Sequence, residues 1–463
     1  MADNRAQTEV LADGDYTLDD DLFDLVEQAV EAGDTETLAR ALEHLHPADI
    51  ADLLEQLDPA TRQRLVALQS GRVGDFDGEI LSELDEGLRE EVVEALAPDV
   101  LADAVRDLET DDVVDLIEDL DEDQQEAVLD ALDASDRVAV EQSLTYPEGS
   151  AGRLMQRELV AVPEHWNVGQ AIDFLREQDE LPEQFYHVIL VDPRMRPTGY
   201  VTLGRLMSSP RDVALRDITE DSFRTIPVLQ DEAEVAYAFN QYHLISAPVV
   251  DEDGRLVGVI TIDDAVDIME EEHEEDIMRL GGVGEESLSD RVWETALSRL
   301  PWLAVNLVTA ILASLVIAQF DAVIAQYVAL AVLMPIVASM GGNAGTQSLT
   351  VAVRAIATKD LTANNVWRVI RREVLVGLLN GAAFAVIMGA VGVAWFGSPM
   401  LGVVIGVAMV INLFVAGLAG VGVPVLLEKL GVDPALASGA FVTTVTDVVG
   451  FFAFLGLASW VLL

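Results

Sequence analysis

The sequence predicts a multidomain membrane protein: an all-α superhelical N-terminal domain, an α+β pair of repeats, a connecting helix, and a polytopic α-helical membrane domain with five transmembrane helices. Three observations support this fold class. Leucines recur at helical spacing before residue 145. Two apolar blocks repeat 59 residues apart between about 150 and 270. Five long apolar stretches follow residue 300.

The charge of the chain is divided unevenly. Of its 81 acidic and 27 basic residues, six of each follow residue 300, so the first 300 residues carry the whole net charge of −54. Such a surface argues against nucleic acid as a partner. Only two of the bases, Lys359 and Lys429, are lysines, and this acidic surface resembles that of halophilic proteins, which salt screens from self-repulsion. Because the chain has no cysteine, any metal is expected to have oxygen ligands, which suit a hard cation.

The N-terminal part predicts stacked helix pairs. Residues 1–20 are expected to be disordered and show no cleaved targeting peptide. Residues 21–145 predict short amphipathic helices separated by Asp or Asp-Pro breaks. A leucine or isoleucine followed three residues later by Leu-Asp recurs at 54–58, 81–85 and 117–121, each time before a second helix. This pattern is typical of a superhelix, and its unequal spacing marks a degenerate repeat.

Residues 146–208 and 209–270 predict two copies of one α+β unit. Each copy orders an amphipathic helix, an apolar strand that ends at Asp, a turn and a second strand. The two strands are 188–191 and 199–202 in the first copy, and they recur 59 residues later. A charged connecting helix is expected over residues 271–299.

The membrane domain is predicted over residues 300–463. Its expected spans are about 301–320, 323–350, 373–396, 400–427 and 434–461. The loop between the second and third spans holds five bases: Arg354, Lys359, Arg368, Arg371 and Arg372. Because basic loops stay on the cytoplasmic side, the acidic half is predicted to be cytoplasmic and the C-terminus extracellular.

Asp447 is a lone carboxylate in the last apolar stretch. It lies roughly 21 Å along a helix that starts at Asp433, inside a hydrocarbon core about 30 Å thick. A charge there costs on the order of 2.5 kcal/mol, so we expect Asp447 to face a polar path with a cation as its partner. Thr443 and Thr444 share its helix face. The alternative is a protonated carboxyl that bonds to a neighbouring helix for packing.

The second predicted span contains a Met-Pro pair and then residues 341–347, Gly-Gly-Asn-Ala-Gly-Thr-Gln. Helix breakers and amides at membrane depth predict an interrupted helix that lines a cavity, with freed carbonyls and the Asn343 amide as oxygen ligands. The alternative is close helix packing, in which Gly341, Gly342 and Gly345 only let neighbouring helices approach.

Four stretches of the chain match the motifs of one known family. They are His46-Pro-Ala-Asp-Ile-Ala-Asp-Leu-Leu, Tyr146-Pro-Glu-Gly-Ser-Ala-Gly-Arg-Leu-Met, the 341–347 motif, and Asp433-Pro-Ala-Leu-Ala-Ser with Thr446-Asp447. Through these residues the chain resembles the MgtE-type magnesium transporter family, whose members are ion channels, over nearly its full length, and residues 146–270 resemble tandem CBS (cystathionine β-synthase) domains. The resemblance implies a homodimer in which the second and fifth membrane helices of each copy line one central pore. In that pore Asp447 holds hydrated Mg²⁺ through its waters, which agrees with the reluctance of Mg²⁺ to lose water.

The resemblance also implies a Mg²⁺ sensor in the cytoplasmic half. The matching carboxylates are Asp231, Asp264, Asp267, Glu272, Glu275 and Asp276. Bound Mg²⁺ would bridge them, draw the repeat pair against the connecting helix and close the pore. The opposing interpretation is a solvated halophilic surface. Two positions depart from the family: His243 stands where an acidic sensor residue is found, and Gly439 where an asparagine near the pore is found.

CBS-type repeats hold the ribose and phosphate of a nucleotide through a Thr-x-x-Asp pattern. The second copy has this pattern at Thr261 and Asp264, whereas the first has Arg205 in place of the acid. These two residues of the second copy are therefore the candidate ATP ligands.

The resulting prediction is a Mg²⁺-selective, Mg²⁺-gated channel for magnesium uptake in the cell membrane. It is not expected to be an enzyme, because the chain has no Gly-Lys-Ser/Thr phosphate-binding loop. Two alternatives stay open. One is a membrane-tethered CBS-type sensor of cations or nucleotides that conducts nothing. The other is a transporter of another divalent ion, Co²⁺ or Mn²⁺, or a proton-coupled exchanger.

Overall fold

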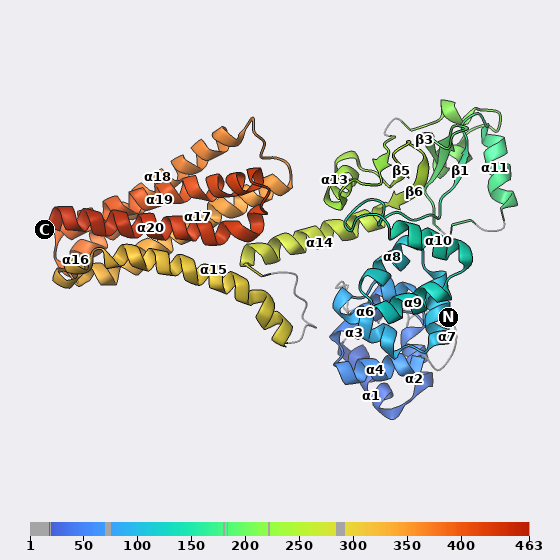
Figure 1. Ribbon diagram of the computed structural model, residues 1–463, viewed down its shortest axis with the longest axis horizontal. Coiled ribbons are helices and arrows are strands. Elements are labelled where there is room, and N and C mark those ends of the chain that lie inside the picture. Colours follow the sequence, from blue (N-terminus) through green and yellow to red (C-terminus); the bar gives the residue numbers. More distant parts are fainter. Residues whose placement is uncertain are drawn as a thin grey trace, which may run out of the picture. The chain divides into compact units, whose positions relative to one another are not determined.

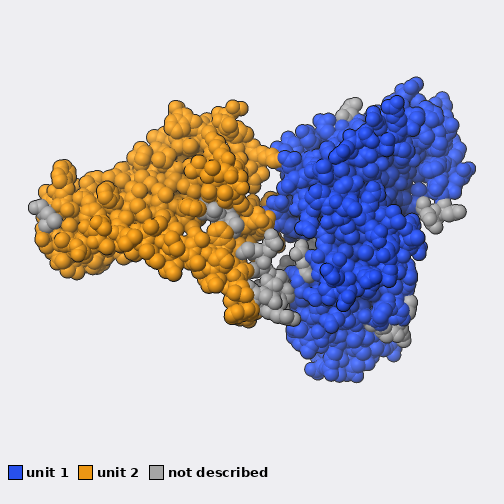
Figure 2. Space-filling model, viewed as in Figure 1, with its two compact units in different colours: residues 1–272, 287–289 blue, residues 273–286, 290–463 orange. Residues whose placement is uncertain are grey.

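The computed structural model describes residues 18, 20–69, 76–178, 181–182, 184–220, 223–283 and 292–462 (Figure 1). The disorder expected for residues 1–20 falls almost wholly outside them. The chain forms two compact units, residues 1–272 with 287–289 and residues 273–286 with 290–463 (Figure 2). The predicted multidomain fold class is confirmed, with a helical N-terminal part, paired small sheets and five helices long enough to span a membrane.

The described residues of the N-terminal part form short helices around one apolar core. The helices are α1 (Asp20–Ala32), α2 (Thr35–Leu42), α3 (Pro47–Gln56), α4 (Pro59–Gln69), α5 (Glu79–Ser82), α6 (Glu86–Ala95), α7 (Pro98–Asp107), α8 (Thr110–Glu118), α9 (Glu122–Ala131) and α10 (Ala134–Ser143). Proline at the first position of α3 and α7 explains where these helices start, because its missing N–H is unused there.

The degenerate repeat reappears as a shared capping contact. In each copy, the second helix sends a side chain back to the last carbonyls of the first. Arg62 donates to Leu54 O at 2.9 Å, Arg89 donates to Ser82 O at 3.0 Å, and Gln125 donates to Ile117 O at 3.0 Å. These side chains satisfy carbonyls that have no partner within their own helix.

The repeat pair contains two three-stranded sheets of the same topology. The first copy comprises β1 (Ala161–Pro163), α11 (Val168–Glu177), β2 (His187–Val191), β3 (Pro197–Thr202) and α12 (Leu203–Ser208). The 3₁₀ turn η2 (Leu215–Asp217) follows it. The second copy comprises β4 (Ile226–Pro227), α13 (Glu232–Tyr242), β5 (Ser246–Val250) and β6 (Leu256–Thr261). The middle strand of each sheet pairs in parallel with the first strand and antiparallel with the third. His187 and Ser246, equivalent residues 59 positions apart, form a hydrogen bond that joins the copies.

Beyond β6 the described residues are entirely helical apart from short connections. The helices are α14 (Ile262–Gly281), α15 (Val292–Ala318), α16 (Asp321–Gln326), α17 (Ala329–Ala357), α18 (Val366–Phe396), α19 (Pro399–Lys429) and α20 (Pro434–Leu462). The candidate spans cover 295–318, 329–357, 366–396, 399–429 and 439–462. The second span thus starts later than expected, because α16 is a separate short helix. The third starts earlier, because α18 continues through the basic residues.

The bundle is organised around α19, the most buried of the candidate spans. It packs against α17, α18 and α20, and α15 lies along α20 (Figure 1). The interruption expected in the second span is absent, since α17 is continuous from Ala329 to Ala357. Pro335 lies near the start of α17 and does not end it.

Two glycines of the 341–347 motif serve helix packing instead of breaking α17. A Cβ at Gly341 would lie 2.1 Å from Asn412 Nδ2 on α19, and one at Gly345 would lie 2.6 Å from Val442 Cγ1 on α20. Such approaches are open only to glycine. Gly342 has no neighbour of this kind within 4 Å.

Candidate functional site

Asp447 and Asn343 lie at the middles of α20 and α17. Each is roughly 20 Å from both ends of its helix at the usual helical rise. The two helix centres are in contact, because Gly345 of α17 packs against Val442 and Thr446 of α20. Both polar side chains are therefore at a similar depth, near the middle of the membrane domain.

The Asp447 carboxylate is half-buried, and within the described residues it makes no hydrogen bond or ion pair. The hydroxyls of Thr443 and Thr444 do not bond to it. They donate instead to the carbonyls of Gly439 and Ala440, at 2.9 and 2.6 Å. Their oxygen lone pairs remain on the same helix face as the carboxylate. This face can accept hydrogen bonds from water or from a hydrated cation.

An exposed polar stripe runs along α17 through Ser339, Asn343, Thr346 and Thr350. The Asn343 amide donates to Ser339 Oγ at the long distance of 3.4 Å. The two threonine hydroxyls donate to their own helix, leaving their oxygens as acceptors. Polar groups at membrane depth need water, an ion or another polypeptide beside them. Asn343 and its polar neighbours lie on the exposed surface of the bundle, whereas Gly341 faces Asn412 inside it.

Buried polar residues that the sequence analysis did not single out hold the bundle together. Asn412 of α19 is completely buried and donates to Val337 O of α17 at 2.8 Å. Ser348 of α17 donates to a carboxylate oxygen of Glu373 on α18 at 2.9 Å, and both are buried. The sequence could have indicated Asn412 in the same way as Asp447, because each is a single polar residue within a long apolar stretch.

The predicted sensing residues Asp264 and Asp267 lie on α14 among acids of the N-terminal helices. Burial, together with the charges of Asp263 and Asp112, raises the pKa of Asp264 to about 7, against hydrogen bonds from Thr261 that lower it. Burial, followed by the charge of Glu83, raises the pKa of Asp267 to about 6. The candidate nucleotide ligands bond to each other: the backbone N–H and the hydroxyl of Thr261 donate to Asp264, at 3.0 and 2.9 Å.

The acids that face α14 come from the start of α8, and sequence analysis missed them. Burial, then the charge of Glu158, raises the pKa of Glu109 to about 7, and burial, then Glu109, raises that of Asp112 to about 7. Burial also raises the pKa of Asp111, well above its usual value. The only sequence signal was the acidic run at 109–112, which looks like many other runs in this chain.

This cluster predicts a pH-dependent and Mg²⁺-dependent stability. Because Glu109, Asp112 and Asp264 have folded-state pKa values above their unfolded values, the folded state binds more protons between about pH 4 and 7, and stability falls as the pH rises through that window. We expect the unfolding temperature of the full chain in detergent to drop by about 5 °C from about pH 5 to 7.5, and Mg²⁺ to restore it. Differential scanning fluorimetry measures both effects.

Asp112→Asn is expected to weaken that pH dependence, because it removes one carboxyl with a raised pKa and the repulsion that it exerts on Asp264. Asp136→Asn, which changes an exposed acid on α10, is the matched control and should leave it unchanged. Equal pH profiles for the two variants would contradict the assignment.

The other predicted sensing residues lie in two further places. Asp231 and Glu272 both lie near Glu232, whose pKa is raised by burial and then by the charges of Glu272 and Asp231. Glu275 and Asp276 lie in the second unit, on the last turns of α14. None of the described residues forms a group of three or more His, Asp or Glu side chains already arranged as a metal site. His243, which stands where the family has an acidic sensor residue, is the C-cap residue of α13 and has a left-handed backbone conformation.

Asp433, which precedes α20, is a further candidate that the sequence analysis named only as part of a motif and not as a site residue. Arg279 of α14 donates to Asp433 Oδ2 at 2.8 Å and also pairs with Glu275. Burial, then the charge of Asp433, raises the pKa of Asp276. Within the second unit, Leu280 packs against Leu349, Val353 and Ala435. The end of α14 is thus held against the ends of α17 and α20.

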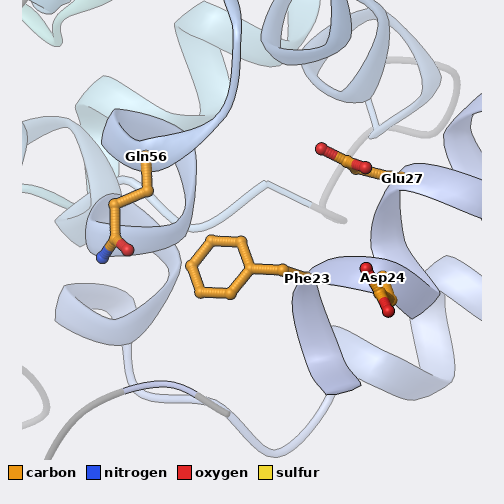
Figure 3. A pocket seen from close by; sticks show the side chains of 4 residues that line it. All are labelled: Phe23, Asp24, Glu27 and Gln56. Atoms are coloured by element: carbon orange, nitrogen blue, oxygen red, sulfur yellow. The ribbon is translucent and has the colours of Figure 1, made fainter. Parts of the chain in front are cut away.

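A pocket on the N-terminal helices is separate from these clusters. Phe23, Asp24, Glu27 and Gln56 line it, and its volume is about 480 Å³. In Figure 3 the Phe23 ring points toward Gln56, and Asp24 and Glu27 lie on the other side of the ring. It contains none of the predicted site residues.

Spanning helices with a carboxylate and an amide at mid-depth, joined to a large acidic soluble half, define a multi-pass membrane transport protein. Residues 334–457 match the family model MgtE, described as a divalent cation transporter, residues 21–149 match the MgtE intracellular N domain, and residues 151–212 and 211–271 match CBS domains. The magnesium transporter MgtE of Thermus thermophilus is 34% identical over 456 residues, which cover 94% of this chain and 98% of that protein. The chain belongs to the MgtE family of divalent cation transporters.

A second curated relative agrees with this membership. The magnesium transporter MgtE of Enterococcus faecalis is 33% identical over 321 residues, 69% of this chain and 71% of that protein. The crystal structure of the cytosolic domain of the Mg²⁺ channel MgtE in complex with ATP is 30% identical and has a TM-score of 0.48, covering 53% of this chain and 99% of that one. The family is one of transporters and not of enzymes.

Proposed function

We propose that this chain is a Mg²⁺-selective channel for magnesium uptake, gated by cytosolic Mg²⁺. The observation that carries the proposal is the Asp447 carboxylate, half-buried at mid-depth of α20 without a bond to any other described residue. A carboxylate at this depth favours a cation as its partner. Because Mg²⁺ dehydrates reluctantly, a carboxylate that accepts hydrogen bonds from its waters lets the ion pass without stripping them.

A homodimer is the assembly that this surface supports. The polar stripe of α17 that contains Asn343 and Thr346 is exposed in the single chain, and lipid is a poor neighbour for it. A second copy related by a twofold axis would enclose the stripe and place two Asp447 carboxylates around one path. The basic loop between α17 and α18 supports cytoplasmic soluble domains and an extracellular C-terminus.

The gate is proposed to depend on α14. This single helix carries Asp264 and Asp267 among acids of the first unit, and Glu275 and Asp276 near Asp433 in the second. Mg²⁺ bound at these places removes the repulsion between the carboxylates around α14. It therefore favours the state in which α14 stays in contact with them, and we assign this state to the closed channel. Thr261 and Asp264 are also the residues at which ATP would act.

The salt-adapted surface is proposed to tune this sensor. A high salt concentration weakens the attraction between carboxylates and Mg²⁺. The Mg²⁺ concentration that closes the channel is therefore expected to rise with KCl.

Uptake into proteoliposomes tests both transport and gating. The intact protein is expected to admit Mg²⁺ when the side bearing the soluble half has little Mg²⁺, and to stop when that side is loaded. Asp267→Asn is expected to raise the closing concentration about threefold to tenfold, because a contact to the waters of Mg²⁺ worth about 0.5–1.5 kcal/mol is lost. Glu252→Gln, which changes an exposed turn acid in the same repeat, is the matched control.

The alternatives make different predictions in the same vesicles. A sensor without transport gives no uptake from vesicles that hold folded protein at low Mg²⁺. A transporter for another ion admits Co²⁺ or Mn²⁺ at least as fast as Mg²⁺. Uptake that acidifies or alkalinises the lumen in proportion to Mg²⁺ indicates proton-coupled exchange. Equal closing concentrations for Asp267→Asn and intact protein would remove Asp267 from the sensor.

A further inference from the structure

Three of the six bases that follow residue 300 line one groove on the N-terminal part of α18. The groove has a volume of about 570 Å³, and its lining includes Trp367, Arg368, Arg371, Arg372, Leu375 and Leu379. These positions are three or four residues apart, so they share one helix face. Along that face the three arginines come before the two leucines.

The length of α18 places this change of polarity at the membrane surface. The helix has 31 residues and is roughly 46 Å long, against a hydrocarbon core of about 30 Å. About ten residues must therefore extend beyond the hydrocarbon. Because charged residues are costly within it, the extension is at the end that carries the arginines. Arg368 to Arg372 are then level with the lipid head groups, and Leu375 and Leu379 with the acyl chains.

The three guanidinium groups are not committed to carboxylates of this chain. Within the described residues, no acidic side chain forms an ion pair with Arg368, Arg371 or Arg372, although acids outnumber bases threefold in the whole sequence. Arg371 lies over the Trp367 ring, 5.3 Å from its centre. Guanidinium groups bind phosphate oxygens in pairs, and tryptophan favours the interface between head groups and hydrocarbon.

We propose that this groove binds an anionic phospholipid. Its phosphate lies at Arg368, Arg371 and Arg372, and an acyl chain follows Leu375 and Leu379. Each base near a membrane surface favours an anionic over a neutral lipid by roughly fivefold, so three give roughly a hundredfold at low salt. The remainder of the chain is strongly acidic and repels such lipids, which confines the preference to this face.

Tryptophan quenching by brominated lipids tests the proposal on the full chain in vesicles. The probes are brominated phosphatidylglycerol and brominated phosphatidylcholine, each at a few mole per cent in unlabelled phosphatidylcholine. The contribution of Trp367 is the difference in quenching between intact protein and Trp367→Phe. We expect brominated phosphatidylglycerol to quench this contribution at a mole fraction at least tenfold lower than brominated phosphatidylcholine, and millimolar inorganic phosphate not to compete.

The composition of the membrane half offers a matched control. Arg368→Gln, Arg371→Gln and Arg372→Gln together remove three charges from the groove, whereas Arg354→Gln, Lys359→Gln and Lys429→Gln remove the other three bases. We expect the first triple variant to lose the preference for brominated phosphatidylglycerol and the second to keep it.

Three results would overturn the proposal. Equal quenching by the two lipids in the intact protein shows no anionic preference, and this comparison decides the matter even if the triple variant does not fold. Equal losses in both triple variants show a general charge effect without a site. A Trp367 contribution that neither lipid quenches shows that protein, such as a second copy or the acidic soluble half, covers the groove.

Discussion

Asp447→Asn is expected to lower Mg²⁺ uptake by at least about tenfold in proteoliposomes held at low Mg²⁺ on the side of the soluble half. The substitution preserves size and removes the charge. A hydrogen bond to a charged group contributes about 1.5–3 kcal/mol, and about 1.4 kcal/mol is a factor of ten in binding. If the proposed dimer places two such carboxylates on one path, both are lost and the decrease is larger.

A fluorescent Mg²⁺ indicator inside the vesicles measures the initial rate, normalised to folded protein. Asp360→Asn is the matched control, because this acid lies in the exposed loop between α17 and α18. Asp447→Glu retains the charge and is expected to keep part of the activity. Unchanged uptake by Asp447→Asn would show that the carboxylate has a packing role.

Gly417→Leu is expected to prevent folding of the membrane domain or to destabilise it by at least about 2 kcal/mol. A Cβ at Gly417 would lie 2.5 Å from the carbonyl oxygen of Glu373 and 3.0 Å from its carbonyl carbon. Both atoms belong to the backbone of α18, so relief requires that α18 and α19 move apart. Helix association in lipid depends on such close approaches.

Gly422→Leu provides the control for this prediction. Gly422 is on the same helix, but a Cβ there would have no neighbour within 4 Å. The unfolding temperature in detergent, followed by fluorescence-detected gel filtration, is expected to fall sharply for Gly417→Leu and little for Gly422→Leu. Similar losses for both variants would mean that leucine is tolerated poorly anywhere on α19.

Local patterns in the chain predicted most of the fold. Apolar length was enough for five spans, and the interval of 59 residues was enough for two equivalent sheets, because strand spacing is set within each copy. The error in the second span has a physical cause. A run such as Gly341-Gly342-Asn343 breaks a helix when its backbone is solvated, but it packs as intact helix when other helices fill the space beside it. In α17 the helix stays intact, because Asn412 of α19 fills the space beside Gly341.

The residues of the candidate site also fall into those that the sequence predicted and those that only the structure revealed. Asp447 and Asn343 were recognisable from the sequence, since a polar residue at the centre of an apolar stretch is unusual wherever the neighbouring helices lie. The buried acids at the start of α8 were not recognisable, because an acidic surface supplies dozens of similar residues and their sequence positions do not report burial. Asp433 was quoted only as a motif residue, because the sequence does not show its ion pair with Arg279. The hydropathy of a segment depends only on consecutive residues, so the sequence alone determines it. Burial and the approach of like charges depend on residues distant in sequence, and packing alone determines which of these carboxylates have shifted pKa values.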